Sequence, residues 1–121
     1  MAALEIRGME QLMDTLSLYE KEQLMKRAEA GLQEGLDAVA EEAYALCPKD
    51  TGALADSIGT RGTMQGDSLL GEVYAAMPYA VYVEMGTQAQ PARPFLFPAL
   101  RAQQDRVFRA LAEAASGKRE A

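Results

Sequence analysis

The chain has 121 residues, 49% of them hydrophobic and 25% charged, which is the composition of one globular domain and not of a disordered chain. It contains no histidine and a single cysteine, so it lacks the commonest general base, the commonest metal ligand and the means to form an intrachain disulfide. The formal net charge of −6 disfavours broad nucleic-acid binding, which needs clustered Lys and Arg. These features argue against an enzyme, and we expect no cofactor.

Charge is distributed unevenly along the chain. Residues 1–50 sum to −6, residues 51–87 to −3 and residues 88–121 to +3. A solvated surface is the ordinary explanation. The alternative is an acidic surface on one subunit that meets a basic surface on the next. No apolar run approaches the ~20 residues that span a bilayer, and the first residues lack the layout of a signal peptide, so we expect no membrane association.

The N-terminal half is expected to be mostly helical. A short edge strand is predicted over residues 4–7, followed by a short helix from Gly8 whose apolar residues recur at helical spacing. Ser17 and Glu20 fit a capping box, which predicts a second helix over residues 18–46 that ends before Pro48. At 1.5 Å per residue this helix is roughly 43 Å long, more than so small a domain needs for its own core. Part of it is therefore expected to serve a neighbouring subunit.

Two glycines, Gly31 and Gly35, lie four residues apart in the second helix. Each costs a helix about 1 kcal/mol relative to alanine. Either the close approach of another backbone offsets that cost, or the glycines are tolerated on the surface. The pattern leaves both explanations open. Cys47, at the end of the helix, is interpreted as a small buried apolar residue.

The C-terminal half mixes strands and helices. Asp50 or Thr51 is predicted to cap a short helical turn. The four glycines between Gly59 and Gly71 penalise a helix, so a hairpin is predicted, with strands over 58–64 and 69–76. Residues 79–85 are apolar and aromatic, and either a strand or a buried helical turn fits them. A loop over 86–94 leads to a last helix with Pro98 in its first turn, and a flexible polar tail begins near residue 117.

The triplet Asp50-Thr51-Gly52 matches the active-site signature of aspartic proteases, short members of which act as dimers. That chemistry needs two such aspartates that share a proton across a dimer axis. In that class the triplet follows an apolar strand, whereas here it follows the end of a long charged helix. A dimeric aspartic protease that acts through Asp50 is therefore the weaker alternative, and no catalytic residue or metal ligand is assigned.

Three motifs occur in order along the chain: PKDTGALADSI over residues 48–58, YAVYVEMGT over 79–87 and ARPFLFPAL over 92–100. Together they resemble a family of head-tail joining proteins, the minor tail components encoded between the connector and major tail genes of long-tailed bacteriophages and prophages. With the helices on either side, the resemblance covers nearly the whole chain.

The resemblance implies an α+β fold in which a long N-terminal helix packs on a small, mostly antiparallel sheet, with a C-terminal helix, in a single domain over residues 1–121. It implies a non-enzymatic structural protein of the virion. Such a protein forms a homo-oligomeric ring at the head-tail joint, where it completes the tail or connects it to the head. The implied partners are other neck, connector and tail proteins, with assembly in the host bacterial cytoplasm. DNA would pass through without sequence-specific binding. The alternative is a prophage-derived interaction module outside a virion.

Several residues are expected to be structural or to lie at an interface. Glu84 and Arg93 are predicted to pair across the 86–94 loop, within or between subunits, because they have opposite charges at its two ends. Gly86 permits a sharp reversal next to Thr87. Pro94 stiffens the loop, and Phe95 and Phe97 supply large apolar anchors. The alternative is that all of these residues close the subunit's own core.

Two further sets of residues concern the ring. Asp67 and Glu72 are predicted to lie near its lumen, because a DNA channel works better when its wall does not bind phosphate. Three basic residues of the C-terminal third are predicted to meet the acidic face of the second helix on a neighbouring subunit: Arg101, Arg106 and Arg109.

Overall fold

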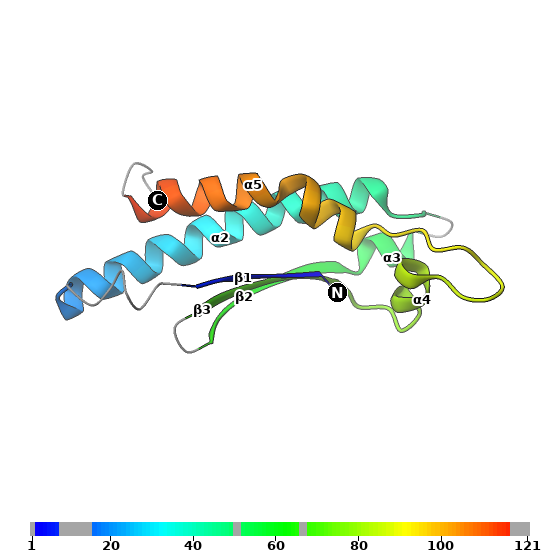
Figure 1. The fold of residues 1–121 in the computed structure, drawn as a ribbon, viewed down its shortest axis with the longest axis horizontal. Coiled ribbons are helices and arrows are strands. Elements are labelled where there is room, and N and C mark those ends of the chain that lie inside the picture. Colours follow the sequence, from blue (N-terminus) through cyan, green and yellow to red (C-terminus); the bar gives the residue numbers. More distant parts are fainter. Residues whose placement is uncertain (1, 8–15, 50–51, 66–67, 117–121) are drawn as a thin grey trace.

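A computed structural model describes residues 2–7, 16–49, 52–65 and 68–116. Along the chain the elements are β1 (Ala2–Ile6), α2 (Leu18–Leu46), α3 (Ala53–Asp56), β2 (Ile58–Gln65), β3 (Ser68–Ala75), α4 (Ala80–Met85) and α5 (Leu96–Ala115). The predicted α+β fold is confirmed. The two long helices lie on one side of a three-stranded sheet, and the short helices α3 and α4 both lie towards the same end of the molecule (Figure 1).

The sheet has the strand order β1-β3-β2, and both pairings are antiparallel. The predicted hairpin is confirmed, since β2 and β3 pair in one unbroken register from Ile58 opposite Ala75 to Gln65 opposite Ser68. The predicted N-terminal edge strand is confirmed as β1, which begins two residues earlier than expected.

Helix α2 begins and ends where the sequence predicted. The Ser17 side chain accepts a hydrogen bond from the Glu20 amide at 3.2 Å, and the Glu20 carboxylate accepts one from the Ser17 amide at 3.2 Å. These bonds from Ser17 hold the pKa of the Glu20 carboxyl below its ordinary value. At the other end Cys47, itself buried, is the C-cap, and Pro48 follows it. Both ends of this helix therefore depend on residues within a few positions of them.

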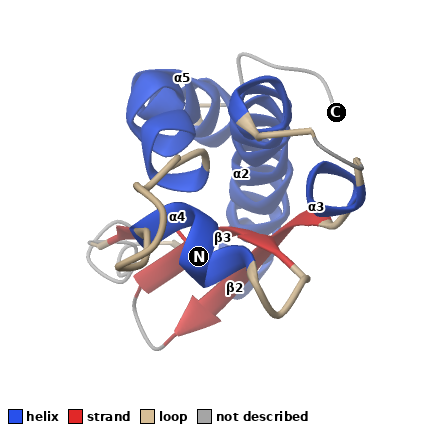
Figure 2. Ribbon diagram, turned by 90° about the vertical axis from the view of Figure 1, so that its right-hand side faces the viewer, coloured by secondary structure: helices blue, strands red, loops and turns tan. Residues whose placement is uncertain are grey.

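The core lies between the sheet and the helix pair, with α2 directly above the strands (Figure 2). Gly62 of β2 and Gly71 of β3 are opposite one another, and their missing side chains leave room for Leu32 and Leu36 of α2. The other large side chains buried as deeply are Val39, Leu69, Val73, Phe95, Leu96 and Val107. The buried face of α5 includes Leu100, Val107, Leu111 and Ala114.

The two glycines of α2 mark its contact with α5. A Cβ built on Gly35 would lie 2.7 Å from the Val107 Cα, and one built on Gly31 would lie 2.8 Å from the Ala114 Cβ. Neither separation is tolerable for carbon atoms. Of the two explanations that the sequence left open, close approach of another backbone is therefore the one that holds.

The segment that the sequence left open, residues 79–85, forms the short helix α4. The predicted short helical turn is present as α3, with Gly52 at its N-cap in the left-handed conformation (φ 82°). The predicted capping residues Asp50 and Thr51 lie outside the described residues, as do the helix predicted from Gly8 and the tail from residue 117.

Candidate interaction surface

Glu84, in the last turn of α4, caps the first turn of α5. Its Oε1 atom accepts hydrogen bonds from the amides of Phe95 at 2.9 Å and Leu96 at 3.0 Å, and its Oε2 atom accepts one from the Phe97 amide at 3.1 Å. The N-cap residue Phe95 has no side chain able to do this. The first amides of a helix have no partner within the helix and favour a negative charge. A carboxylate from eleven residues earlier in the chain therefore supplies the cap.

The loop after α4 is closed by backbone hydrogen bonds. The Gly86 amide donates to the Tyr82 carbonyl at 2.8 Å, and the Arg93 amide donates to the Val83 carbonyl at 2.8 Å. Gly86 has φ 82°, and a Cβ there would lie 2.7 Å from the Ala92 amide nitrogen, so the predicted sharp reversal is present. The Thr87 hydroxyl accepts hydrogen bonds from the amides of Ala89 at 3.2 Å and Gln90 at 3.1 Å, which tighten the turn.

The predicted ion pair between Glu84 and Arg93 is not formed within the subunit. The ion pair found among the described residues joins Arg7 to Glu5, while both Glu84 oxygens accept from amides at the start of α5. Burial raises the pKa of the Cys47 thiol above its ordinary value, against smaller opposing effects of the Lys49 and Arg93 charges. A pair between subunits stays a prediction.

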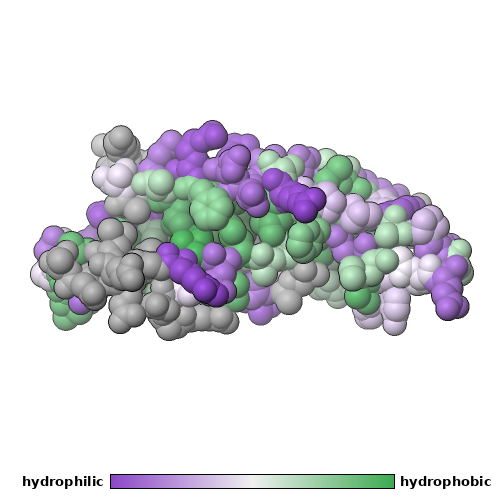
Figure 3. Space-filling view, in the orientation of Figure 1, coloured by the Kyte–Doolittle hydropathy of each residue, from purple (hydrophilic) through white to green (hydrophobic). Residues whose placement is uncertain are grey.

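The two predicted apolar anchors have different environments. Phe95 is fully buried and follows Pro94 directly, so it closes the subunit's own core. Phe97 is 56% exposed. It belongs with other exposed apolar side chains on and beside α4, which we call the α4 patch: Tyr79, Val81, Tyr82, Met85 and Phe97. Figure 3 shows apolar surface towards the end of the molecule that α4 occupies. Large apolar side chains grouped at the surface are typical of an interface.

The three basic residues singled out from the sequence are exposed on α5. Arg106 and Arg109 line a shallow surface hollow together with Glu34 of α2 and Glu113 of α5. Acidic groups of the same subunit are therefore near two of the three arginines. Whether Arg101, Arg106 and Arg109 also reach a neighbouring subunit stays a prediction.

One face of the sheet is not covered by the long helices (Figure 2). Glu72 projects on this bare face from the central strand, between Ala3 of β1 and Arg61 of β2. The Arg61 guanidinium lies over the Tyr74 ring, with its carbon 5.4 Å from the ring centre. Asp67, the other residue predicted to face a lumen, lies outside the described residues.

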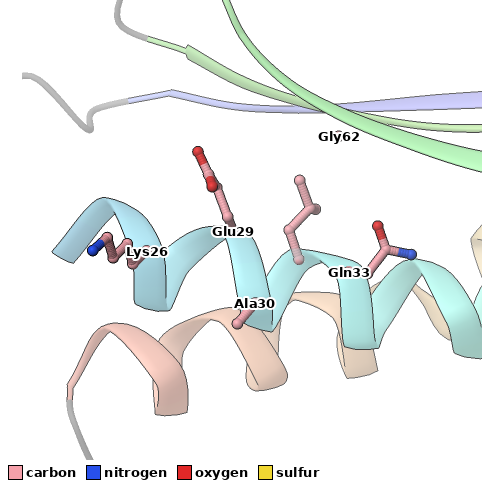
Figure 4. A pocket seen from close by; sticks show the side chains of 6 residues that line it. Lys26, Glu29, Ala30, Gln33 and Gly62 are labelled. Atoms are coloured by element: carbon pink, nitrogen blue, oxygen red, sulfur yellow. The ribbon is translucent and has the colours of Figure 1, made fainter. Parts of the chain in front are cut away.

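An open hollow of about 400 Å³ lies between α2 and the edge of β2 (Figure 4). Its lining is mostly polar and comprises Lys26, Glu29, Ala30, Leu32, Gln33 and Gly62. The Gln33 amide donates to Asp37 at 2.8 Å and to the Thr60 hydroxyl at 3.0 Å, which joins α2 to β2. The hollow therefore runs beside an exposed strand edge and is not enclosed.

The described residues hold no group of three His, Cys, Asp or Glu side chains placed to bind a metal ion. No helix in the described part of the chain is both long and apolar enough to cross a membrane.

Sequence reasoning missed the role of Glu84 as a cap and the α4 patch. The signal for the first was present, since the predicted last helix begins without Ser, Thr, Asp or Asn at its N-cap. A helix without a local cap needs an acceptor from elsewhere in the fold. The sequence contains no signal for the α4 patch, because apolar residues in a short segment are equally compatible with a buried position in the core and an exposed one at the surface.

A protein-family model described as "HK97-gp10_like: Bacteriophage HK97-gp10, putative tail-component" matches residues 10–86. The match covers α2, α3, the β2–β3 hairpin and α4, and ends at Gly86. Two further comparisons, one with curated proteins and one with solved structures, gave no match.

Proposed function

The chain belongs to the HK97-gp10-like family of bacteriophage tail components, and from this premise we propose that it is a structural subunit of the virion that forms a ring at the head-tail joint. The ring completes the tail or connects it to the head, and its partners are other neck, connector and tail proteins. Assembly takes place in the host bacterial cytoplasm. The observation that best supports an assembly role is the α4 patch, in which Val81, Tyr82, Met85 and Phe97 are 55%, 61%, 75% and 56% exposed.

The α4 patch lies at one end of an elongated molecule whose strands run along its length (Figure 1). In a ring whose axis runs roughly along the strands, this end points towards the next component of the neck. The Glu84 cap ties α4 to the start of α5, so the patch is held on a fixed part of the fold. We assign the α4 patch to contact with a different phage protein.

The bare sheet face is assigned to the lumen. Glu72 stands at its centre, and the neighbouring Arg61 is occupied by the Tyr74 ring. With a net charge of −6 on each chain, the wall of such a ring repels DNA phosphates and lets the duplex pass. DNA then passes without sequence-specific binding.

Deleting the gene from its phage or prophage tests the proposed function directly. Electron microscopy is expected to show separate heads and tails, and expression of the protein in trans should restore joined particles. An epitope tag on the restored protein should be labelled at the neck. Joined, infectious particles made without the gene would refute a role at the head-tail joint.

The double substitution Tyr82→Ser with Met85→Ser is expected to abolish incorporation into particles. Both side chains are exposed, so the free energy of unfolding should change by no more than about 0.5 kcal/mol. The measurement is the amount of protein in purified particles, with thermal unfolding of the free protein beside it. Leu18→Ser is the matched control, because Leu18 is 74% exposed and is the first residue of α2, which begins at the opposite end of the molecule from α4 (Figure 1). This variant should be incorporated normally.

Replacing Arg101, Arg106 and Arg109 together with glutamate is expected to prevent ring assembly or incorporation, with circular dichroism unchanged. Exposed ion pairs contribute only ~0–1 kcal/mol each, so they set orientation while apolar contacts supply affinity. The triple lysine variant keeps the charge and should assemble. Normal assembly of the glutamate variant would show that the arginines belong to a solvated surface.

A further inference from the structure

Within the described part of the chain, both outer strands of the sheet have an open edge. Strand β3 is paired on both sides, whereas β1 and β2 each pair with β3 alone among the described strands. No backbone hydrogen bond joins β2 to any other described element. A strand edge presents a row of donors and acceptors that another chain can pair with.

Strand β2 lacks the features that normally protect an edge. Its eight residues, IGTRGTMQ, pair without a bulge and contain no proline and no lysine. Arg61 is the one charged residue among them. Proteins usually protect a long edge with such residues, with a bulge or with a covering segment. A regular, unprotected edge of this length indicates a surface that is covered in the assembled state.

The two edges lie on opposite sides of the molecule and have different surroundings. Helix α5 packs near β1, and Figure 3 shows apolar surface between them on the visible face. Helix α2 packs on β2, and the open hollow between them is the one shown in Figure 4. A contact between unlike surfaces of identical subunits closes into a ring when the rotation divides the circle.

The outer strands carry opposite charges on the bare face of the sheet. Glu5 of β1 is opposite Leu70, and Arg61 of β2 is opposite Glu72. The Glu5 carboxylate accepts hydrogen bonds from Arg7 and from the Ser68 hydroxyl, both at 3.0 Å. Arg61 is held over the Tyr74 ring. Each side chain is therefore positioned at its own edge, and Glu5, which already pairs with Arg7, has the opposite charge to Arg61.

We propose that β1 of one subunit adds to β2 of the next, so that a single sheet runs around the ring and brings Glu5 opposite Arg61 of the neighbouring subunit. The proposal rests on the proposed ring and names the contact that closes it. Both strands run antiparallel to β3, so they point the same way, and rotation about the ring axis preserves that direction. The new pairing is therefore parallel, with backbone hydrogen bonds that supply affinity and Glu5 and Arg61 that set the register.

A disulfide between the two edges tests this contact. Glu5→Cys and Arg61→Cys are combined in a Cys47→Ala background and supplied in trans to phage that lack the gene. Within one subunit β3 separates the two strands by roughly 10 Å, too far for a disulfide, whereas directly paired strands lie close enough. After mild oxidation of purified particles, a non-reducing gel should show loss of the monomer in favour of a ladder of multimers. Each single-cysteine variant should remain monomeric.

A matched pair, Leu18→Cys with Gln88→Cys, places the cysteines at exposed positions at the start of α2 and in the loop after α4, away from both strand edges and outside the α4 patch, and should give no ladder. A ladder from this pair and none from the edge pair would overturn the proposal, as would a dimer from Arg61→Cys alone, which indicates β2 pairing with its own copy. Incorporation without any cross-link would also overturn it while the ring proposal stands. Absence of the wild-type protein from particles would instead refute the proposed function.

If the double-cysteine variant is not incorporated, the charge-reversal variants Glu5→Arg and Arg61→Glu decide the question. Each single substitution should reduce incorporation, and combining the two should restore it. Failure of the combined variant to be incorporated would overturn the proposal.

Discussion

Glu84→Ala should lower the free energy of unfolding by about 2–3 kcal/mol, which is a large part of the stability of so small a domain. The substitution removes the acceptor for three backbone amides at the start of α5, two of them partly buried. It also releases the tie between α4 and α5 that positions Phe95 in the core. Chemical denaturation followed by circular dichroism measures the loss.

Glu84→Gln distinguishes the contribution of the hydrogen bonds to stability from the contribution of the negative charge. A glutamine keeps one side-chain oxygen, which can still accept from the Phe95 and Leu96 amides, so its cost should be about half that of alanine. Glu41→Ala, on the exposed part of α2, is the control for loss of a surface carboxylate and should change stability by no more than about 0.5 kcal/mol. Equal stability of the Glu84→Ala and Glu41→Ala variants would show that the cap contributes nothing.

Gly35→Ala should destabilise the protein by about 1–3 kcal/mol, although alanine is the better helix former by about 1 kcal/mol. The added methyl group would lie 2.7 Å from the Cα of Val107, a backbone atom that cannot move aside without shifting α5. The helices must separate, and the contact along the whole pair is weakened. Thermal and denaturant unfolding measure the effect, and the double variant with Gly31→Ala should lose more.

Ala30→Gly is the control that measures the effect of helix propensity on stability without a change in packing. Ala30 is exposed in the same helix next to Gly31, so the change should cost about 1 kcal/mol and nothing for packing. A Gly35→Ala variant more stable than the wild type would show that α5 does not pack this closely against α2.

The sequence by itself determined the features whose causes are local. The ends of α2 follow from the Ser17–Glu20 capping box and from Pro48, because those interactions join residues within one turn. The β2–β3 hairpin follows from glycines that penalise a helix, and the first turn of α5 tolerates Pro98. The three motifs identified the family, and the family match confirms it.

Only the tertiary structure decided what depends on contacts between distant residues. The sequence of the short α4 segment fits a strand or a helix equally well, because six residues, five of them apolar, have no decisive periodicity. Opposite charge suggested Arg93 as the partner of Glu84, but the Glu84 carboxylate accepts hydrogen bonds from amides at the start of α5, which have no partner within their own helix. Gly31 and Gly35 signalled a close approach without naming the helix that approaches. Such contacts join residues that are distant in the sequence. They form only when the whole chain folds, so no short sequence pattern predicts them.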